Sequence, residues 1–247
     1  MFDFIRKDVL WRAWEQEWHL ELAASSPKPR RIGFLPRRGQ APHFQLKSTQ
    51  DLAVYEHLRD LRGGRIAEAG GGNSRILPAL ARHNNCTNID RFEGQGGGPK
   101  DINAPEGIRI ARTFLGEFSE ELEEESFDAV CSVSVIEHVP TGDLKPFLED
   151  GLRILKTGGL WVHAIDLYLE DTPQRNVEMR FAAYRSWMDD ERLQPTGPVH
   201  SGPPRFSCDM ATNPDDIMYL WGEVAPDLIP LRQKAQAVSI ILAARKR

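Results

Sequence analysis

The sequence predicts a single α/β domain whose largely parallel sheet is covered by helices on both faces. Three observations lead to this prediction. Short apolar runs alternate with segments of helical periodicity from residue 48 onward, and the first run is followed at once by a cluster of three glycines. The chain has 247 residues, enough for one large core but few for two. We therefore expect one main domain, residues 48–247, preceded by an N-terminal extension, residues 1–47.

The elements of the main domain have local signals. Residues 48–51 have the capping-box form, apolar residues follow at helical spacing from Leu52 to Leu61, and two glycines at 63–64 form a stop. The later elements follow from apolar runs bounded by turn residues. They are strands at 65–69, 86–90, 108–111, 127–133, 160–165 and 237–243, and helices at 75–83 and 144–155.

The N-terminal extension is expected to be a helix followed by a connector. Residues 3–24 lack Pro and Gly, and Trp11, Trp14, Trp18 and Leu22 recur at spacings of three and four. We expect this apolar face to pack on the main domain; covering an acceptor site or forming a homodimer contact are the alternatives. The basic residues from 28 to 38 are interrupted by Pro and Gly, which indicates a solvated connector rather than a nucleic-acid patch.

Residues 167–213 form a segment without clear periodicity. Five prolines stand there among polar and aromatic residues, at positions 173, 195, 198, 203 and 204. Long irregular segments in a compact domain commonly carry function. We interpret the segment as an inserted lid or acceptor-binding segment, followed by a helix near residues 215–224.

Composition excludes several classes of protein. A formal net charge of −5 gives no general attraction to polyanions, so no nucleic-acid partner is expected. No apolar run approaches the roughly 18 residues that cross a bilayer, and the N-terminus lacks a secretory signal, so we expect a soluble, cytoplasmic protein. The three cysteines, Cys86, Cys131 and Cys208, are far apart and form no paired motif, which predicts reduced thiols and no metal site.

The glycine cluster predicts a ligand site. Gly70, Gly71 and Gly72 lie between a predicted strand and a helix, at the edge of the sheet where open α/β folds bind ligands. Asp90 ends the next strand, at the position from which a carboxylate accepts hydrogen bonds from ribose. A nucleoside-containing ligand follows. Arg75 stands where the dinucleotide fingerprint needs a third glycine, which weakens but does not exclude an NAD(P)-dependent oxidoreductase.

Four segments extend this pattern: residues 68–74 (EAGGGNS), Asp90, residues 127–140 (FDAVCSVSVIEHVP) and residues 152–160 (LRILKTGGL). Their order and spacing across residues 48–166 resemble the class I S-adenosylmethionine (SAM)-dependent methyltransferases, particularly the branch that includes ubiquinone- and menaquinone-biosynthesis enzymes. Ser74 replaces the family's usual third glycine. The resemblance implies a Rossmann-like SAM methyltransferase sandwich with a mostly parallel seven-stranded sheet, and it fades before residue 46 and after Asp166.

The resemblance also implies a cofactor, SAM, and roles for individual residues. Residues near its amino-acid portion would come from the first motif, its ribose would be held by one acid, and its adenine framed by the segment around residue 117. The residues expected to bind the cofactor are Glu68, Gly70, Gly71, Gly72, Asp90, Glu117, Phe118, Ser132 and Val133.

The chemistry of methyl transfer needs little from the protein beyond alignment of the acceptor and exclusion of water. If the acceptor must lose a proton, His138, His163 or Asp166 is the expected base, because each is predicted near the carboxyl end of a strand. For each of them a purely structural role is the alternative: a helix cap, a satisfied strand histidine and a loop cap. The three show no recognised ligand spacing for a metal.

The expected reaction is transfer of a methyl group to an O or N atom of a small-molecule acceptor, such as a glycosidic or secondary metabolite. The alternatives are the NAD(P)-dependent oxidoreductase and a catalytically silent SAM-fold partner protein. The second is suggested by Ser74 and by the Trp-rich N-terminus.

Overall fold

The structure is a computed structural model that describes residues 1–6, 8–25, 46–94, 99–101, 107–170, 174–204 and 235–247. The predicted connector at 28–38, the predicted helix near 215–224 and Cys208 lie outside the described residues. The other two cysteines, Cys86 and Cys131, are free and buried.

One sheet of eight strands organises the described residues, in the order β1-β8-β6-β5-β2-β3-β4 with β7 also paired to β8. The five strands from β6 to β4 are parallel neighbours, and β8 runs antiparallel to β6. The strands are β1 (Phe2–Phe4), β2 (Arg65–Ala69), β3 (Asn85–Ile89), β4 (Ile108–Ala111), β5 (Phe127–Val133), β6 (Leu155–Glu170), β7 (Leu193–Pro195) and β8 (Ala235–Lys246).

The predicted mostly parallel α/β sheet is confirmed, and its width is seven strands. Both β1 and β7 pair with β8, at residues 240–242 and 244–246 respectively, so they share one edge of the sheet end to end. The strands predicted at 65–69, 108–111 and 127–133 have these bounds in the structure. β6 and β8 run beyond their predicted ends, because each pairs with the other over eleven residues.

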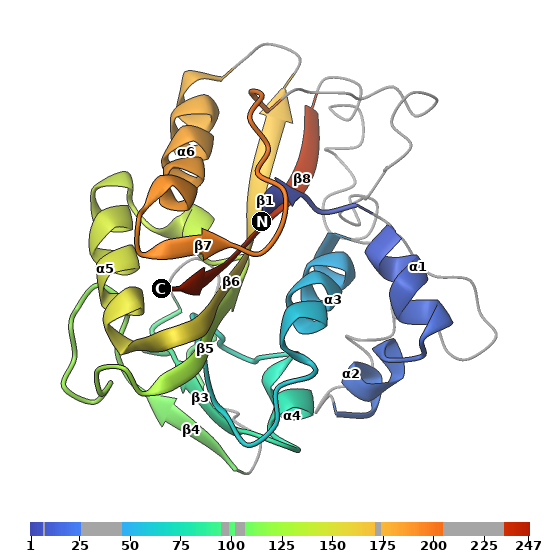
Figure 1. The fold of residues 1–247 in the computed structure, drawn as a ribbon, viewed down its shortest axis with the longest axis vertical. Coiled ribbons are helices and arrows are strands. Elements are labelled where there is room, and N and C mark those ends of the chain that lie inside the picture. Colours follow the sequence, from blue (N-terminus) through green and yellow to red (C-terminus); the bar gives the residue numbers. More distant parts are fainter. Residues whose placement is uncertain (7, 26–45, 95–98, 102–106, 171–173, 205–234) are drawn as a thin grey trace.

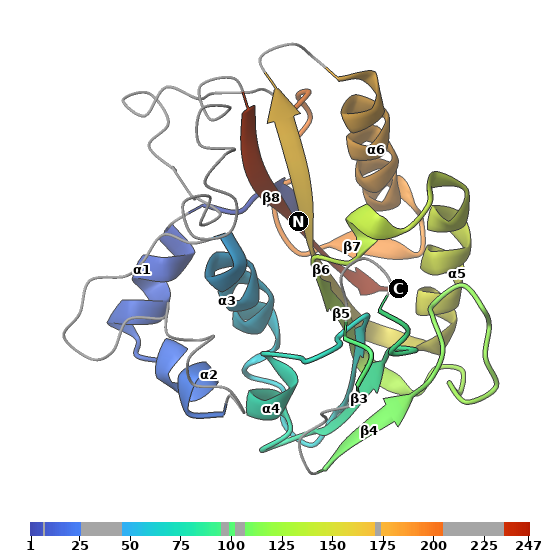
Figure 2. The ribbon, with the colours of Figure 1, turned by 180° about the vertical axis from the view of Figure 1, so that it is seen from behind.

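Helices cover both faces of the sheet (Figures 1 and 2). One face carries α5 (Leu144–Ile154) and α6 (Arg175–Ser186); the other carries α1 (Asp8–Glu15), α2 (His19–Ser25), α3 (Leu46–Leu58) and α4 (Leu77–Leu80). Each face buries its own apolar cluster, because side chains alternate along a strand. Ala67 and Ala69 of β2 therefore pack beneath α5, whereas Ile66 joins the cluster under α3.

The prediction of one helix over residues 3–24 is wrong. Residues 2–4 form strand β1, and two short helices follow with Glu17 between them in the left-handed region, at φ 57°. The interruption turns α2 so that Trp18 packs against Tyr55 of α3 at a ring distance of 6.0 Å. Trp18 is buried, as the packing interpretation expects, but Trp11 stays 39% exposed.

The described part of the predicted lid, up to residue 204, is largely regular structure, which corrects the prediction of an irregular segment. Residues 167–170 belong to β6, and α6 and β7 follow. Phe181 and Tyr184 lie one turn apart on α6 and are buried against the main core. The prolines suggested irregular structure, but Pro195 ends β7, and Pro198, Pro203 and Pro204 follow it, so none of these four interrupts a helix or strand. Residues 205–213 lie outside the described residues.

The capping box predicted at residues 48–51 is also wrong. Helix α3 already includes Leu46 and Lys47, so these four residues stand inside its first turns. Gln50 and Asp51 instead send their side chains to residues of other elements, which places them next to the candidate site.

Candidate active site at the carboxyl ends of the strands

The glycine turn follows β2 and is too tight for side chains at several positions. Gly70 and Gly72 have φ of 60° and 48°, a region that favours glycine. A Cβ atom on Gly70 would lie 2.7 Å from Val135, and one on Gly71 would lie 2.6 Å from the Asn88 amide oxygen. The turn is thus pressed between the ends of β3 and β5, with its backbone groups at the carboxyl edge of the sheet.

Asp90 closes this turn from the end of β3. Its carboxylate accepts hydrogen bonds from the Gly72 amide at 2.9 Å and from the Phe92 amide at 2.7 Å. Each oxygen of a carboxylate has a second lone pair and can accept another hydrogen bond. Asp90 therefore links the glycine turn to the next strand and keeps capacity for the hydroxyl groups of a ligand.

Two amide side chains at the turn have buried oxygen atoms without a hydrogen-bond partner in the structure, Asn73 Oδ1 and Asn88 Oδ1. The Asn88 nitrogen is used, since it donates to the Gly72 carbonyl at 2.8 Å. Buried acceptors without partners are rare in folded proteins, because losing water costs free energy. They suit a ligand that brings hydrogen-bond donors, such as the ammonium group and ribose of SAM.

Glu68 lies beneath the turn with 3% of its surface exposed. It accepts a hydrogen bond from the Ser74 hydroxyl, and Ser74 Oγ in turn accepts the Leu77 amide at 3.0 Å. Ser74 therefore supports the start of α4, which explains a serine where the family pattern usually has glycine. Burial raises the pKa of Glu68 to about 7.

Glu68 predicts a pH dependence of stability. The folded protein holds the Glu68 proton more tightly than the unfolded chain, so the free energy of unfolding should fall as pH rises from about 4.5 to about 7. Glu68→Gln removes this titration, and its stability relative to wild type should improve by on the order of 2 to 3 kcal/mol across that range. Urea unfolding at pH 5 and pH 8 measures the difference, with the exposed Glu120→Gln as control. Parallel pH profiles for wild type and Glu68→Gln would refute it.

The residues predicted near adenine lie on the loop after β4. Glu117 accepts hydrogen bonds from Thr113 Oγ1 at 2.7 Å and from the Phe114 amide at 3.1 Å, and it forms an ion pair with Arg91. The Phe118 ring is 49% exposed, and φ at this residue is 53°. The loop leaves an exposed aromatic ring beside a fixed carboxylate, at the side of the site that β3 and β4 form.

Ser132 and His163 lie in the interior of the sheet. The Ser132 hydroxyl is hydrogen-bonded to His163 Nδ1 at 2.7 Å, and both side chains are fully buried. Burial lowers the pKa of His163 to about 3, so the ring is neutral, and it packs 4.0 Å from the Trp161 ring centroid. This geometry favours a structural role for His163 over that of a base, and it directs the Ser132 hydroxyl to His163 in the interior. Val133 is only partly buried.

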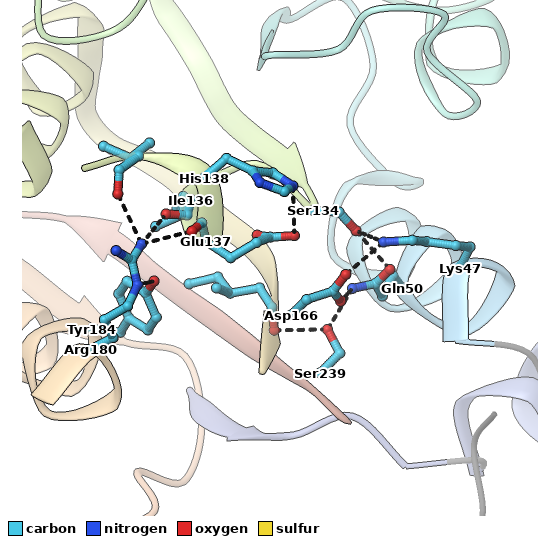
Figure 3. Close-up of polar contacts among 12 residues, drawn as sticks. Lys47, Gln50, Ser134, Ile136, Glu137, His138, Asp166, Arg180, Tyr184 and Ser239 are labelled. Carbon is cyan, nitrogen blue, oxygen red and sulfur yellow. Dashed lines mark hydrogen bonds and ion pairs between the residues drawn. The ribbon is translucent and has the colours of Figure 1, made fainter. Parts of the chain in front are cut away.

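A polar group that we name the Asp166 cluster joins α3 to Ser134, directly after β5, and to Asp166 and Ser239, which are paired within β6 and β8 (Figure 3). The Lys47 ammonium donates to Asp166 Oδ2 at 2.6 Å and to Ser134 Oγ at 2.5 Å. The Gln50 amide donates to Asp166 Oδ1 and to Ser239 Oγ, the latter at 2.7 Å. Asp166 thus forms an ion pair with Lys47 and accepts one hydrogen bond on each carboxylate oxygen.

The turn after β5 carries Glu137 and His138 on a short helix, η2 (Ile136–His138). The His138 side chain is 57% exposed and its Nε2 lies 3.9 Å from Glu137 Oε1. Arg180 of α6 anchors the turn, donating from Nη2 to the carbonyls of residues 136, 137 and 139 at 2.9 to 3.0 Å (Figure 3).

The structure brings some predicted residues together and adds others. Glu68, Gly70–Gly72 and Asp90 meet at one turn, and His138 lies on the turn after β5. Asp166 was predicted near the end of its strand, but β6 continues to Glu170 because it pairs with β8. Sequence reasoning missed Lys47, Gln50, Glu137 and Arg180. Glu137 stood in the quoted EHV segment and could have been found there. Lys47 and Gln50 lie on a helix that the sequence predicted, but at positions read as outside it or as its cap, and Arg180 lies on a helix that the sequence did not predict. Among the described residues, no group of three or more His, Cys, Asp or Glu side chains is arranged to hold a metal ion.

Comparison with known proteins identifies the domain. Residues 67–163 match the family model of the methyltransferase domain. The chain is similar to the geranyl diphosphate C-methyltransferase of Streptomyces coelicolor A3(2), solved with Mg²⁺, geranyl diphosphate and S-adenosyl-L-homocysteine, at 15% identity over 82% of this chain and 80% of that chain, with a TM-score of 0.53. A geranyl diphosphate methyltransferase solved with GPP and sinefungin gives 15% identity, coverage of 81% and 77%, and a TM-score of 0.51.

A third similar structure is the 1,6-didemethyltoxoflavin-N1-methyltransferase of Burkholderia thailandensis, with 15% identity, coverage of 94% and 89%, and a TM-score of 0.48. No curated protein matches the sequence. Within the described residues, no helix has the length and apolarity needed to span a membrane. Residues 67–163 therefore carry a methyltransferase domain, and the described residues have the fold of the similar solved methyltransferases.

Proposed function

We propose that this methyltransferase transfers the methyl group of SAM to an O or N atom of a small-molecule acceptor. The observation that carries the proposal is the glycine turn, where tight backbone, buried amide oxygens without partners and the Asp90 carboxylate converge. In this proposal residues 70–73 and Glu68 hold the amino-acid portion of SAM. Asp90 holds its ribose, and Glu117 and Phe118 border its adenine, while the backbone at Ser132 and Val133 lines the pocket.

SAM supplies an electrophilic methyl group on a sulfonium centre. The protein's own task is to fix the acceptor atom in line with that group and to exclude water from it. The glycine turn after β2, which Asp90 holds, fixes one side of the site, and the turn after β5, which Arg180 holds, fixes the other. The glycine turn is assigned to SAM, and none of its residues belongs to the Asp166 cluster. We therefore assign the acceptor to the other side of the site, which His138 and the Asp166 cluster border.

A small acceptor is favoured over a macromolecule by the charge of the chain. The sequence has 36 acidic against 31 basic residues, so nucleic acid finds no general attraction. A homodimer contact through the Trp-rich N-terminus has less support than the sequence suggested, because Trp18 packs against Tyr55 of the same chain.

Ligand-dependent thermal stability tests this function. SAM and S-adenosyl-L-homocysteine are expected to raise the midpoint of thermal unfolding with saturation, whereas NAD and NADP leave it unchanged. Transfer of a radiolabelled methyl group to a panel of phenols, sugars and amines then tests the reaction. Stabilisation by a nicotinamide cofactor but not by SAM would refute the proposal, and SAM binding without transfer to any acceptor would favour the silent partner.

A further inference from the structure

Glu137 is a mostly buried carboxyl group to which no other side chain donates a hydrogen bond. It follows β5 by four residues, on η2, and 14% of its side chain is exposed. Its carboxylate has no side-chain hydrogen-bond partner, and the backbone amides of Glu137 and Asp166 are the donors that act on it. A buried acid in this state is costly, and such groups gather at functional sites.

The surroundings of Glu137 are charged on several sides. Asp166 of β6 and Lys47 of α3 act on it electrostatically, His138 lies 3.9 Å away on the same turn, and Glu137 influences the Tyr184 hydroxyl of α6. Figure 3 shows its carboxyl group between the residues that surround Arg180 and those of the Asp166 cluster.

Glu137 is also connected to the cofactor side. Val135, two residues before it, lies against Gly70 so closely that a Cβ atom there would be 2.7 Å away. Arg75, which pairs with Asp51 at 2.5 Å, responds electrostatically to both Asp166 and Glu68. The carboxyl group therefore lies in the same network of charges as the acid beneath the glycine turn.

We propose that Glu137 is the catalytic base that accepts a proton from an O–H or N–H acceptor during methyl transfer. This inference rests on the proposed function and names the group that the reaction needs when its acceptor loses a proton. In this step the acceptor oxygen or nitrogen forms a bond to the methyl carbon while the sulfur–methyl bond breaks. The electron pair of that bond stays on sulfur, and the acceptor proton moves to a carboxylate oxygen of Glu137.

The other candidate bases are less suited to this step. Asp166 already accepts hydrogen bonds from Lys47 and Gln50, so both of its carboxylate oxygens are engaged by donors of the protein. His163 lies in the core. His138 is more than half exposed, which suits a group that passes the proton from Glu137 on to water.

Burial, and then the charge of Asp166, raise the pKa of Glu137 to about 8, against the opposing effects of the backbone amides of Glu137 and Asp166 and of the Lys47 charge. The basic form therefore becomes more abundant as pH rises through about 8. If Glu137 is the base, the rate of transfer should rise with pH over the same range. Arg180 is a positioning residue here, since it holds the carbonyls of the turn that carries Glu137.

The test compares wild type with Glu137→Gln, Glu137→Asp and the exposed control Glu120→Gln. S-adenosyl-L-homocysteine binding is measured by calorimetry, and labelled-methyl transfer is measured with a panel of phenols and primary amines from pH 6 to 9. Infrared spectroscopy of the full chain records the protonated carboxyl band at pH 6. We expect Glu137→Gln to bind S-adenosyl-L-homocysteine within about twofold of wild type, to lose at least about 100-fold in transfer rate and to lose one carboxyl band.

Further expected results are partial activity for Glu137→Asp, unchanged activity for Glu120→Gln and a wild-type rate that rises towards pH 8. Transfer by Glu137→Gln within about threefold of wild type overturns the inference and leaves the proposed function standing. Identical infrared spectra of wild type and Glu137→Gln at pH 6 also overturn it. Absence of transfer by wild type to every probe overturns the proposed function and this inference with it.

Discussion

Replacing Gly72 with Asp is expected to abolish SAM binding. Gly72 has φ 48°, and a Cβ atom there would lie 2.9 Å from Pro99 Cδ and 3.7 Å from Asp90 Oδ2. The new carboxylate would therefore crowd the turn and stand beside the acid assigned to the ribose. Strain of about 1 to 3 kcal/mol from the backbone conformation adds to this repulsion. Calorimetry with S-adenosyl-L-homocysteine should show affinity reduced by more than about 100-fold.

Gly142→Asp is the matched control, because the same change is made where a Cβ atom meets nothing within 4 Å. It should bind S-adenosyl-L-homocysteine like wild type. Circular dichroism separates loss of binding from loss of fold. A folded Gly72→Asp variant with affinity close to that of wild type would show that the glycine turn does not hold the cofactor.

Replacing Asp90 with Ala is expected to weaken SAM binding by about tenfold to a hundredfold. The change removes the acceptor assigned to the ribose hydroxyls, and hydrogen bonds to a charged group contribute about 1.5 to 3 kcal/mol each. It also frees the Gly72 and Phe92 amides that Asp90 now binds, so some loss of stability accompanies it. The dissociation constant for S-adenosyl-L-homocysteine, measured by calorimetry, gives the size of the effect.

An analogue of S-adenosyl-L-homocysteine without ribose hydroxyls separates the two effects of Asp90→Ala. If Asp90 grips the sugar, the analogue should bind wild type more weakly than the parent compound, while Asp90→Ala should bind both about equally. The exposed Asp143→Ala serves as control. Equal preference of wild type and Asp90→Ala for the parent compound would contradict the assignment of Asp90.

The glycine turn and the end of β3, which we assign to the cofactor, could be placed from the sequence because their signals are local. The apolar runs of β2 and β5 are buried between two helical layers, so their length and composition indicate their bounds. The glycines and Asp90 meet because adjacent parallel strands end at one edge of the sheet. Short-range pattern and the rules of parallel sheets are sufficient for this part.

The acceptor half could not be predicted because its contacts cross large sequence distances. Lys47 and Asp166 are 119 residues apart, and Arg180 lies 41 residues from the Val139 carbonyl that it binds. The polar residues at the start of α3 resembled a helix cap. Nothing in the neighbouring sequence indicates that the hydrogen-bond partners of Gln50 are on β6 and β8. Residues 3 and 4, predicted to begin a helix, instead belong to β1, because they pair with β8, more than 230 residues away in the sequence.

Titratable side chains show a similar division. His163 matched a base by its position on a strand, but its pKa is set by side chains such as Trp161 that pack around it in three dimensions. Glu137 stood in the same recognisable segment as His138, yet its burial depends on how η2 lies against the sheet and α6. Burial of an individual side chain was therefore the property that the sequence predicted least well.

A crystal structure of the chain with S-adenosyl-L-homocysteine tests the central assignment most directly. We predict the ribose hydroxyls within hydrogen-bond distance of the Asp90 carboxylate and the amino-acid portion of the ligand against residues 70–73. A ligand found away from the end of β3, or a turn still covered by Pro99 with Asp90 bonded only to protein, would contradict the assignment.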